Sequence, residues 1–150
     1  MPQLQKFQAF LYANIPLVSH MQMQLLDLDS DTIMASAPLS PNINDKATVF
    51  GGSSAALMTI CGWSLIKMNL ENVQVTNDVV IHHSKLNWHL AQRDDMKIMA
   101  NLSESVDWKE IAENMHSKSR ATKVKVYSQI MNQAGERCSD MHATYVILKQ

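Results

Sequence analysis

A long stretch without any charged residue, bounded by Lys46 and Lys67, most constrains how this chain folds, because 18% of all its residues are charged. Two adjacent glycines, Gly51 and Gly52, lie within it. The residues that follow, 53–68, place apolar side chains on nearly every side of a helix. A helix that is apolar all round is buried on all sides, so we predict a central helix around which the rest of the chain folds.

The glycine pair also predicts a binding element at the start of that helix. The first N–H groups of a helix have no partner inside it, and they lie at the positive end of the helix dipole. Such an end attracts anions or the polarised oxygen of a carbonyl group. Ser53 or Ser54 is expected to cap the helix. Gly62, in its interior, is tolerable if a strand or a partner helix crosses closely there.

The flanking sequence alternates between apolar and polar residues in the manner of β-strands. We expect strands at residues 21–25, 33–39, 75–90, 96–102, 122–130 and 141–147, and short amphipathic helices at residues 2–14 and 107–115. The order predicts an α+β fold in which about six mostly antiparallel strands wrap one helix. No repeat or boundary divides the sequence, so residues 1–150 are predicted to form a single domain.

The composition excludes several classes of function. A formal net charge of -1 with no basic block gives no electrostatic footprint for nucleic acid. The apolar part of the central helix is about 14 residues, short of the roughly 20 that a bilayer needs. Polar residues near the N-terminus do not fit a signal peptide. The two cysteines, Cys61 and Cys138, are interpreted as reduced thiols. We therefore expect a cytoplasmic protein that contacts neither membrane nor nucleic acid.

Three segments carry a resemblance to a known superfamily. They are Ala-Pro-Leu-Ser-Pro-Asn-Ile-Asn at 37–44, Thr-Val-Phe-Gly-Gly-Ser at 48–53, and Ala-Ala-Leu at 55–57 continuing to Gly62-Trp63. With these residues, the chain resembles the hot-dog-fold thioesterases, and most closely the bacterial thioesterase domain that in some proteins follows an acetyltransferase domain. The spacing from Asn44 to the glycine pair also looks like the Asn-x5-His-Gly-Gly signature of acyl-CoA thioesterases in this superfamily.

The resemblance implies a hot-dog fold and a thioester hydrolase. In similar enzymes the acyl-CoA thioester lies across a dimer interface, which implies a homodimer or a dimer of dimers here. The amide of Gly51 would polarise the thioester carbonyl, with Gly52 allowing close approach, and Asn44 would position the attacking water. Val49 and Phe50, beside the glycines, would contact the substrate. Coenzyme A would enter as part of the substrate, so no separate cofactor is expected.

Two positions depart from the pattern of these relatives. Phe50 replaces the histidine that many of them carry before the glycines. Thr59 stands where many of them carry a catalytic Asp or Glu, and residues 53–68 contain no carboxylate at all. The usual general base or nucleophile is therefore missing. Either another residue activates water, or the protein binds acyl-thioesters without hydrolysing them efficiently.

Several other residues are candidates for the site. Ser53 and Thr59 carry hydroxyls on the central helix, and Asp45 is a carboxylate near its start. His82 and His83 are possible bases, but alternation sends them to opposite faces of one strand. His89 and His142 are weaker candidates. No spacing of His, Cys and Asp predicts a metal site.

A local basic cluster predicts contacts with the phosphates of coenzyme A. Lys118 and Arg120 are the residues we assign to this role, and a solvated strand edge is the alternative. Three functions stay open at this point. The sequence favours a thioesterase acting on acyl-CoA. The alternatives are a non-catalytic protein that binds acyl-CoA or an acyl carrier, and a dehydratase of hydroxyacyl thioesters.

Overall fold

The structure is a computed structural model that describes residues 2–117 and 121–150. Two helices come first, α1 (Pro2–Asn14) and α2 (Pro16–Met21), followed by the hairpin of β1 (Gln24–Leu28) and β2 (Thr32–Ala37). A 3-10 turn, η1 (Ser40–Asn42), leads to the long helix α3 (Gly51–Asn72). The remaining elements are β3 (Val79–Trp88), β4 (Met96–Leu102), α4 (Trp108–Ser117), β5 (Thr122–Met131) and β6 (Arg137–Ile147).

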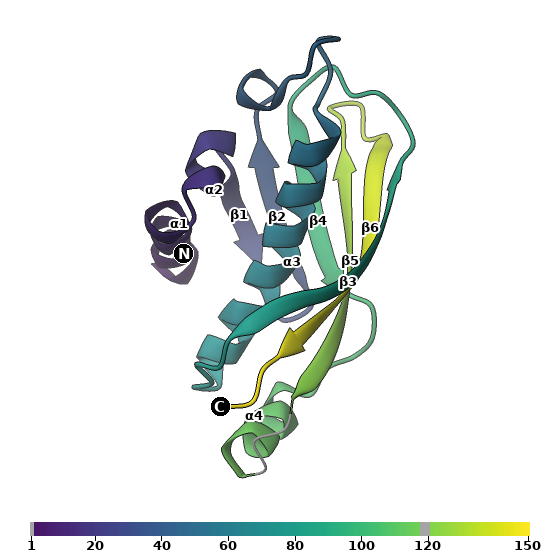
Figure 1. Cartoon of the computed structure of the whole chain (residues 1–150). Helices are drawn as coiled ribbons and strands as arrows, with labels where there is room; N and C mark the ends of the chain where they lie inside the picture. Colours follow the sequence, from purple (N-terminus) through teal and green to yellow (C-terminus); the bar gives the residue numbers. More distant parts are fainter. Residues whose placement is uncertain (1, 118–120) are drawn as a thin grey trace.

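The strands form one sheet with the order β1-β2-β4-β5-β6-β3, and every neighbouring pair is antiparallel. The sheet curls around α3, which runs along it (Figure 1). The sequence predicted this arrangement of one central helix and six strands, and the structure confirms it.

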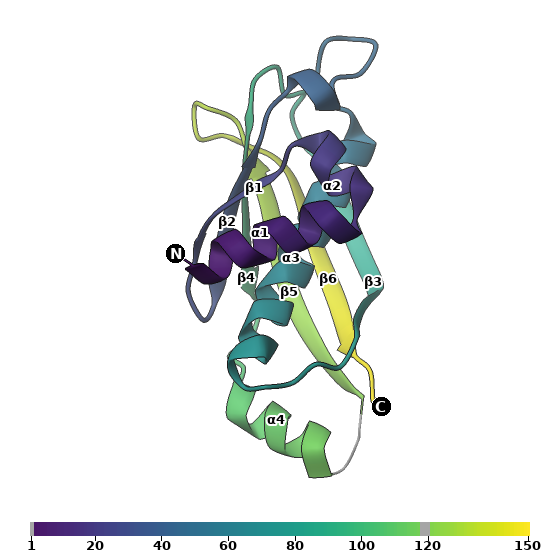
Figure 2. The ribbon, with the colours of Figure 1, turned by 90° about the vertical axis from the view of Figure 1, so that its left-hand side faces the viewer.

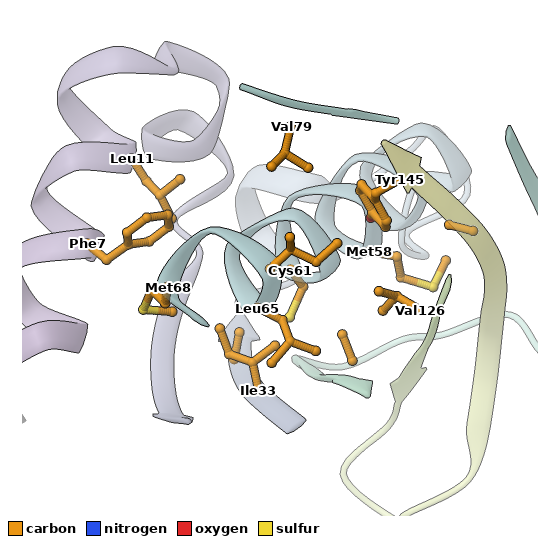
Figure 3. Packing of buried hydrophobic residues seen from close by; sticks show 14 of the residues in the cluster. Phe7, Leu11, Ile33, Met58, Cys61, Leu65, Met68, Val79, Val126 and Tyr145 are labelled. Carbon is orange, nitrogen blue, oxygen red and sulfur yellow. The ribbon is translucent and has the colours of Figure 1, made fainter. Parts of the chain in front are cut away.

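The centre of the core is the contact between α3 and β6. Figure 3 shows the ring of Tyr145 directed at α3 beside Met58 and Cys61. The tyrosine hydroxyl donates a hydrogen bond to the Thr59 carbonyl at 2.7 Å. A Cβ on Gly62 would lie 2.5 Å from the same hydroxyl oxygen. The sequence predicted that something crosses the helix closely at Gly62. The structure shows that this close neighbour is Tyr145 of β6.

Helix α1 covers the other side of α3, and Figure 2 shows it crossing in front of that helix. Leu4, Phe7 and Leu11 are its buried residues. Phe7 lies 5.9 Å from Trp63 of α3 between ring centroids, and the Trp63 indole donates to the Val79 carbonyl at 2.7 Å. The aromatic contacts thus join α1, α3 and the start of β3.

The two edges of the sheet differ in how their backbone groups are covered. On β1, the Gln8 side chain of α1 accepts a hydrogen bond from the Leu25 N–H at 2.7 Å, and Tyr12 donates to the neighbouring Met23 carbonyl at 2.8 Å. On β3, which is 10 residues long, Trp63 of α3 donates to the carbonyl of the first residue, Val79, and no other helix side chain of the described chain bonds to the strand's backbone. The β3 edge is therefore the one open to pairing.

Some boundaries predicted from the sequence were wrong. Residues 16–21 form α2, because Pro16 at the first helical position starts a helix as readily as it ends the preceding one, and β1 consequently begins at Gln24. Helix α3 begins at Gly51 and continues to Asn72, beyond the predicted residues 53–68. Its N-cap is Phe50 without a side-chain hydrogen bond, so neither Ser53 nor Ser54 caps it.

The facing of β3 was also predicted incorrectly. The pairing with β6 jumps from Ile81–Tyr145 to His83–Thr144, which makes His82 the extra residue of a β-bulge. A bulge adds one residue to the strand, so the side chains that follow it point to the face opposite to the one that strict alternation predicts. One alternating pattern from residue 75 to residue 90 is therefore wrong. The strand also begins only at Val79. Both His82 and His83 are exposed.

Candidate active site

Backbone hydrogen bonds fix the loop that leads into α3. The Phe50 N–H donates to the Asn42 carbonyl at 2.8 Å, and the Val49 N–H donates to the Gln92 carbonyl at 2.8 Å. The Phe50 carbonyl accepts the N–H groups of Ser53 and Ser54 at 2.9 and 3.2 Å. These bonds hold the chain in place at the point where the helix begins.

The amides of Gly51 and Gly52 have no acceptor among the residues that the structure describes. They are the first N–H groups of a 22-residue helix with no acidic residue in its first turn. The positive end of the dipole is thus left without a neighbouring side-chain carboxylate to neutralise it. The predicted pair of free donors is therefore present at this helix start.

Two aromatic side chains lie against the glycines. A Cβ built on Gly51 would be 3.2 Å from Nε1 of Trp88, and a Cβ built on Gly52 would overlap Cε2 of Phe50. Trp88 and Phe50 are 57% and 55% exposed, so both rings are only partly covered. A side chain at either glycine would therefore displace an aromatic ring that is more than half exposed.

A pocket of about 190 Å³ opens at Gly51. It lies between the start of α3, the segment that follows β3, and the first residues of β6. Its lining residues are Val49, Gly51, Ser54, Trp88, His89, Leu90, Ala91, Gln92, Cys138 and Ser139. None of these is an Asp or a Glu, so the pocket presents amides and hydroxyls but no carboxylate.

Asn44 is held by its own loop. Its side-chain oxygen accepts the N–H groups of Lys46 and Thr48 at 2.9 and 3.1 Å, and its amide nitrogen donates to the Thr48 hydroxyl at 2.9 Å. Such bonds are typical of Asx turns and fix the loop that precedes the helix. Asn44 thus supports the loop, and it is not among the residues that line the pocket.

The other predicted site residues are scattered. The Thr59 hydroxyl donates to the Ala55 carbonyl within α3 at 2.8 Å, away from the helix start. Asp45 is exposed and pairs with Lys46 at 3.2 Å. Ser53 is half-buried, but Ser54, one residue on, is the serine that lines the pocket. Lys118 and Arg120 lie outside the described residues. Of the predicted residues, only Val49, Gly51 and His89 line the pocket together.

Neither cysteine is suited to act as a nucleophile. Both are free and buried. Burial raises the pKa of the Cys61 thiol to about 12, and burial is also the main cause that raises the pKa of Cys138. Since the thiolate is the reactive form, both groups are protonated at neutral pH.

A polar cluster joins β3, β5 and β6 behind the pocket, and its centre is the buried carboxylate of Asp140. This carboxylate accepts hydrogen bonds from Asn87 at 3.2 Å and from Tyr127 at 3.1 Å, and it lies 3.2 Å from Nε2 of His89. Arg137 is 3.5 Å away. Burial alone would raise the pKa of Asp140, but these hydrogen bonds together hold the pKa below its usual value.

Replacing Asp140 by asparagine tests this cluster. The variant should unfold with a free energy lower by about 1–3 kcal/mol at pH 7, because hydrogen bonds to a charged acceptor are lost. A depressed pKa in the folded state means that the contribution is present above the unfolded value of about 3.9 and is lost as the pH falls through the folded pKa. Urea unfolding should therefore show the difference shrinking below pH 4. A difference that stays constant from pH 7 to pH 3 would contradict this assignment.

The described part of the chain holds neither a cluster of metal-ligating side chains nor a helix that could span a membrane. Within residues 2–117 and 121–150, no group of three His, Cys, Asp or Glu side chains lies close enough together to hold a metal ion. In the same residues, no helix has the length and apolar character needed to cross a bilayer.

The curled antiparallel sheet and its single long helix define a hot-dog fold, and solved structures agree. A putative thioesterase from Shewanella oneidensis aligns with a TM-score of 0.86 at 23% identity, covering 98% of both chains. A protein of unknown function from Chlorobaculum tepidum aligns with a TM-score of 0.84 at 22% identity, over 97% of this chain and 94% of that one. A thioesterase from Haemophilus influenzae aligns with a TM-score of 0.76 at 15% identity, over 97% and 90%.

The sequence itself identifies the family. The profile of the family described as "Putative thioesterase (yiiD_Cterm)" matches residues 4–149. This chain belongs to that family of the hot-dog thioesterase superfamily. No curated protein matches the sequence.

The structure adds residues that sequence reasoning did not assign to the site. Ser54, Trp88, Gln92 and Ser139 line the pocket, and Asp140 holds the cluster behind it. Ser54 could have been found from its helical spacing of three residues after Gly51. The others come from segments far from the glycines in sequence, and nothing in their local pattern marks them.

Proposed function

We propose that this protein hydrolyses acyl thioesters of coenzyme A. The observation that carries the proposal is the pair of free amides at Gly51 and Gly52 at the N-terminus of a buried helix, where Gly51 also lines a pocket. Amides in this position stabilise the negative charge that develops on a carbonyl oxygen during attack. Membership of a thioesterase family supports the same reaction.

In the proposed reaction the thioester carbonyl oxygen accepts hydrogen bonds from the two glycine amides. A water oxygen attacks the carbonyl carbon, and the amides stabilise the resulting oxyanion. The carbon–sulfur bond then breaks. The carboxylic acid retains the water oxygen and one of its protons, and the other proton of the water goes to the sulfur, so that coenzyme A leaves as its thiol. Asn44 contributes by holding the loop through which the chain enters α3, and Thr48 is its partner in that loop.

Release of free thiol from acyl-CoA measures this reaction. The wild-type protein should release thiol in proportion to enzyme concentration with saturable kinetics. Asn44→Ala should lower the rate by about tenfold, because the loop that sets the glycine amides loses three hydrogen bonds. Equal rates for the two proteins would remove Asn44 from the mechanism. Absence of wild-type thiol release across acetyl-, butyryl- and decanoyl-CoA would reject hydrolysis.

One observation favours a second function, namely binding of acyl-CoA or an acyl carrier without hydrolysis. The pocket contains no carboxylate, and α3 has none along residues 51–70. Calorimetry distinguishes the two functions, since tight binding of acyl-CoA without thiol release would select the binding protein. The dehydratase alternative has no supporting observation, because Phe50 and Thr59 stand where a histidine and a carboxylate would be needed.

The proposed active form is at least a homodimer that pairs through β3. The β3 edge is open, whereas side chains of α1 cover the β1 edge. Val80 and Ile81 on β3 are 43% and 39% exposed, which leaves apolar surface beside unpaired backbone groups. An open edge of this kind pairs readily with another strand.

Sedimentation tests the dimer. The wild-type protein should sediment as a dimer or a dimer of dimers at micromolar concentration. Replacing Val80 and Ile81 together by lysine should weaken the dimer at least about tenfold, because charges on an edge oppose strand pairing. The control replaces Gln24 and Leu26 of the covered β1 edge by lysine and should leave the assembly unchanged. A wild-type monomer at these concentrations would overturn the proposal.

A further inference from the structure

Large apolar side chains are exposed at the surface where α3 begins. Two segments of the chain supply them, residues 43–50 and 88–90, and the Val49 N–H joins these segments by donating to the Gln92 carbonyl at 2.8 Å. The side chains, each about half exposed, are Ile43, Phe50, Trp88 and Leu90. Apolar surface that gathers in one place on a folded protein marks a site where something binds.

The rings of Phe50 and Trp88 stand beside the two free amides. A Cβ on Gly51 would contact the Trp88 indole, and a Cβ on Gly52 would overlap the Phe50 ring. The rings therefore flank the glycines that hold the thioester carbonyl in the proposed reaction. Because the acyl chain starts at the carbonyl carbon, its first carbons lie within reach of these rings when the carbonyl oxygen accepts the amides.

The chemistry of the surroundings favours the acyl group as the part of the substrate that covers the rings. The arm of coenzyme A next to the sulfur carries amide groups, which need hydrogen-bond partners that an aromatic ring does not supply. An apolar acyl group covers the rings favourably, because apolar surface of both is removed from water.

The same surroundings disfavour an acyl group that ends in a carboxylate. The lining of the pocket at Gly51 includes no lysine and no arginine. The histidine in it, His89, lies 3.2 Å from the Asp140 carboxylate and is therefore already engaged. A carboxylate at the far end of an acyl group would lose water without gaining a cationic partner.

We propose that Phe50 and Trp88 select thioesters whose acyl group is apolar and uncharged, by covering that group beside the carbonyl. This inference rests on the proposed thioester-binding function. It also explains why Phe50 replaces the histidine of similar enzymes, since the ring supplies apolar surface in place of an ionisable group. Both are specificity-determining residues, because the reaction itself needs only the amides and water.

The test compares kcat/KM for acetyl-, succinyl-, octanoyl- and phenylacetyl-CoA. The wild-type protein should prefer the octanoyl and phenylacetyl compounds over acetyl-CoA by at least about tenfold, because one fully buried methylene group is worth about fourfold in an equilibrium constant. Succinyl-CoA should be no better than acetyl-CoA, although its acyl group is longer. A wild-type protein that uses acetyl- or succinyl-CoA as well as octanoyl-CoA would overturn the inference.

Phe50→Ala and Trp88→Ala each remove one ring. Each variant should lower the ratio of kcat/KM for octanoyl-CoA to that for acetyl-CoA by at least about threefold, and thermal unfolding verifies that it folds. Alanine suits position 50 because it cannot cap α3, whereas a serine or asparagine at this N-cap would itself accept amides of the first turn. An unchanged ratio in both variants would contradict the role of the rings.

Phe10→Ala is the matched control. The Phe10 ring on α1 is also largely exposed, at 44%, but it lies in a different groove, beside Lys67 and Glu71. This variant should keep the wild-type ratio. Loss of the ratio in all three variants would show that the preference does not come from the rings at the glycines.

Sedimentation distinguishes the acyl group from a second copy of the chain as the occupant of this surface. Phe50→Ala and Trp88→Ala should sediment as the wild type does at micromolar concentration. Variants that lose the assembly together with the preference would assign the rings to an interface between copies and overturn the inference.

Binding separates this inference from hydrolysis. If no compound releases thiol, the proposed hydrolysis fails, and dissociation constants for the same four compounds test the rings alone. Tighter binding of the octanoyl and phenylacetyl compounds by the wild type than by Phe50→Ala or Trp88→Ala supports the inference. Equal binding of all four compounds by the wild type overturns it.

Discussion

Gly51→Pro is expected to lower kcat for acyl-CoA hydrolysis by about 10²–10³-fold relative to Gly51→Ala, because proline removes the N–H that the mechanism requires. Removal of one such donor from an oxyanion site costs about 2.7–4 kcal/mol of transition-state stabilisation. The two variants share a Cβ in the same position, 3.2 Å from the Trp88 ring. Their difference therefore isolates the amide from the added bulk.

The local structure accepts proline at this position. Gly51 is the first residue of α3, where proline is favoured. Phe50 before it has φ -65° and ψ 129°, which is the extended conformation that a residue before proline prefers. The Gly51 N–H makes no hydrogen bond within the described chain. Unfolding curves should thus be similar for Pro and Ala, and similar kcat values would remove this amide from catalysis.

Gly62→Val is expected to lower the free energy of unfolding by about 3 kcal/mol. The new Cβ would lie 2.5 Å from the Tyr145 hydroxyl oxygen and 3.0 Å from its Cζ, and the tyrosine is fully buried. The ring must shift and lose its hydrogen bond to the Thr59 carbonyl. Overpacking of a core costs typically 1–3 kcal/mol, and the lost bond adds to it. Urea denaturation measures the change.

A double-mutant cycle assigns the cause to Tyr145. Gly62→Ala introduces the Cβ alone, and Tyr145→Phe removes the oxygen that it would meet. Gly62→Ala should cost less stability in the Tyr145→Phe background than in the wild type, with a coupling of about 1 kcal/mol. Strict additivity would show that the glycine is not required by this contact.

The central helix and the six strands were predictable because their signals are local. A helix with apolar residues on all sides must be buried, and the alternation of apolar and polar residues indicates the strands around it. The glycine pair predicted a loop that opens this helix, but the helix begins at Gly51 and not at residue 53.

The facing of β3 and the pocket wall were not predictable from local patterns. One bulged residue, His82, reverses the alternation, and nothing in the residue types around it marks the bulge. Ser139 and Asp140 acquire their roles from cross-strand partners on β3 and β5. Only part of the role of Asn44 was predictable. Its spacing from the glycines was visible, but its bonds to Thr48 appear only in three dimensions.

The most direct test of the account uses the four glycines of the chain as reporters. In protein labelled with ¹⁵N-glycine, binding of a ketone analogue of butyryl-CoA, with a methylene in place of sulfur, should move the amide protons of Gly51 and Gly52 downfield. The signals of Gly62 and Gly135 should remain in place, since one is buried in mid-helix and the other lies in the turn between β5 and β6, outside the lining of the pocket. An analogue that binds without shifting Gly51 or Gly52 would contradict the central claim that these amides hold the thioester carbonyl.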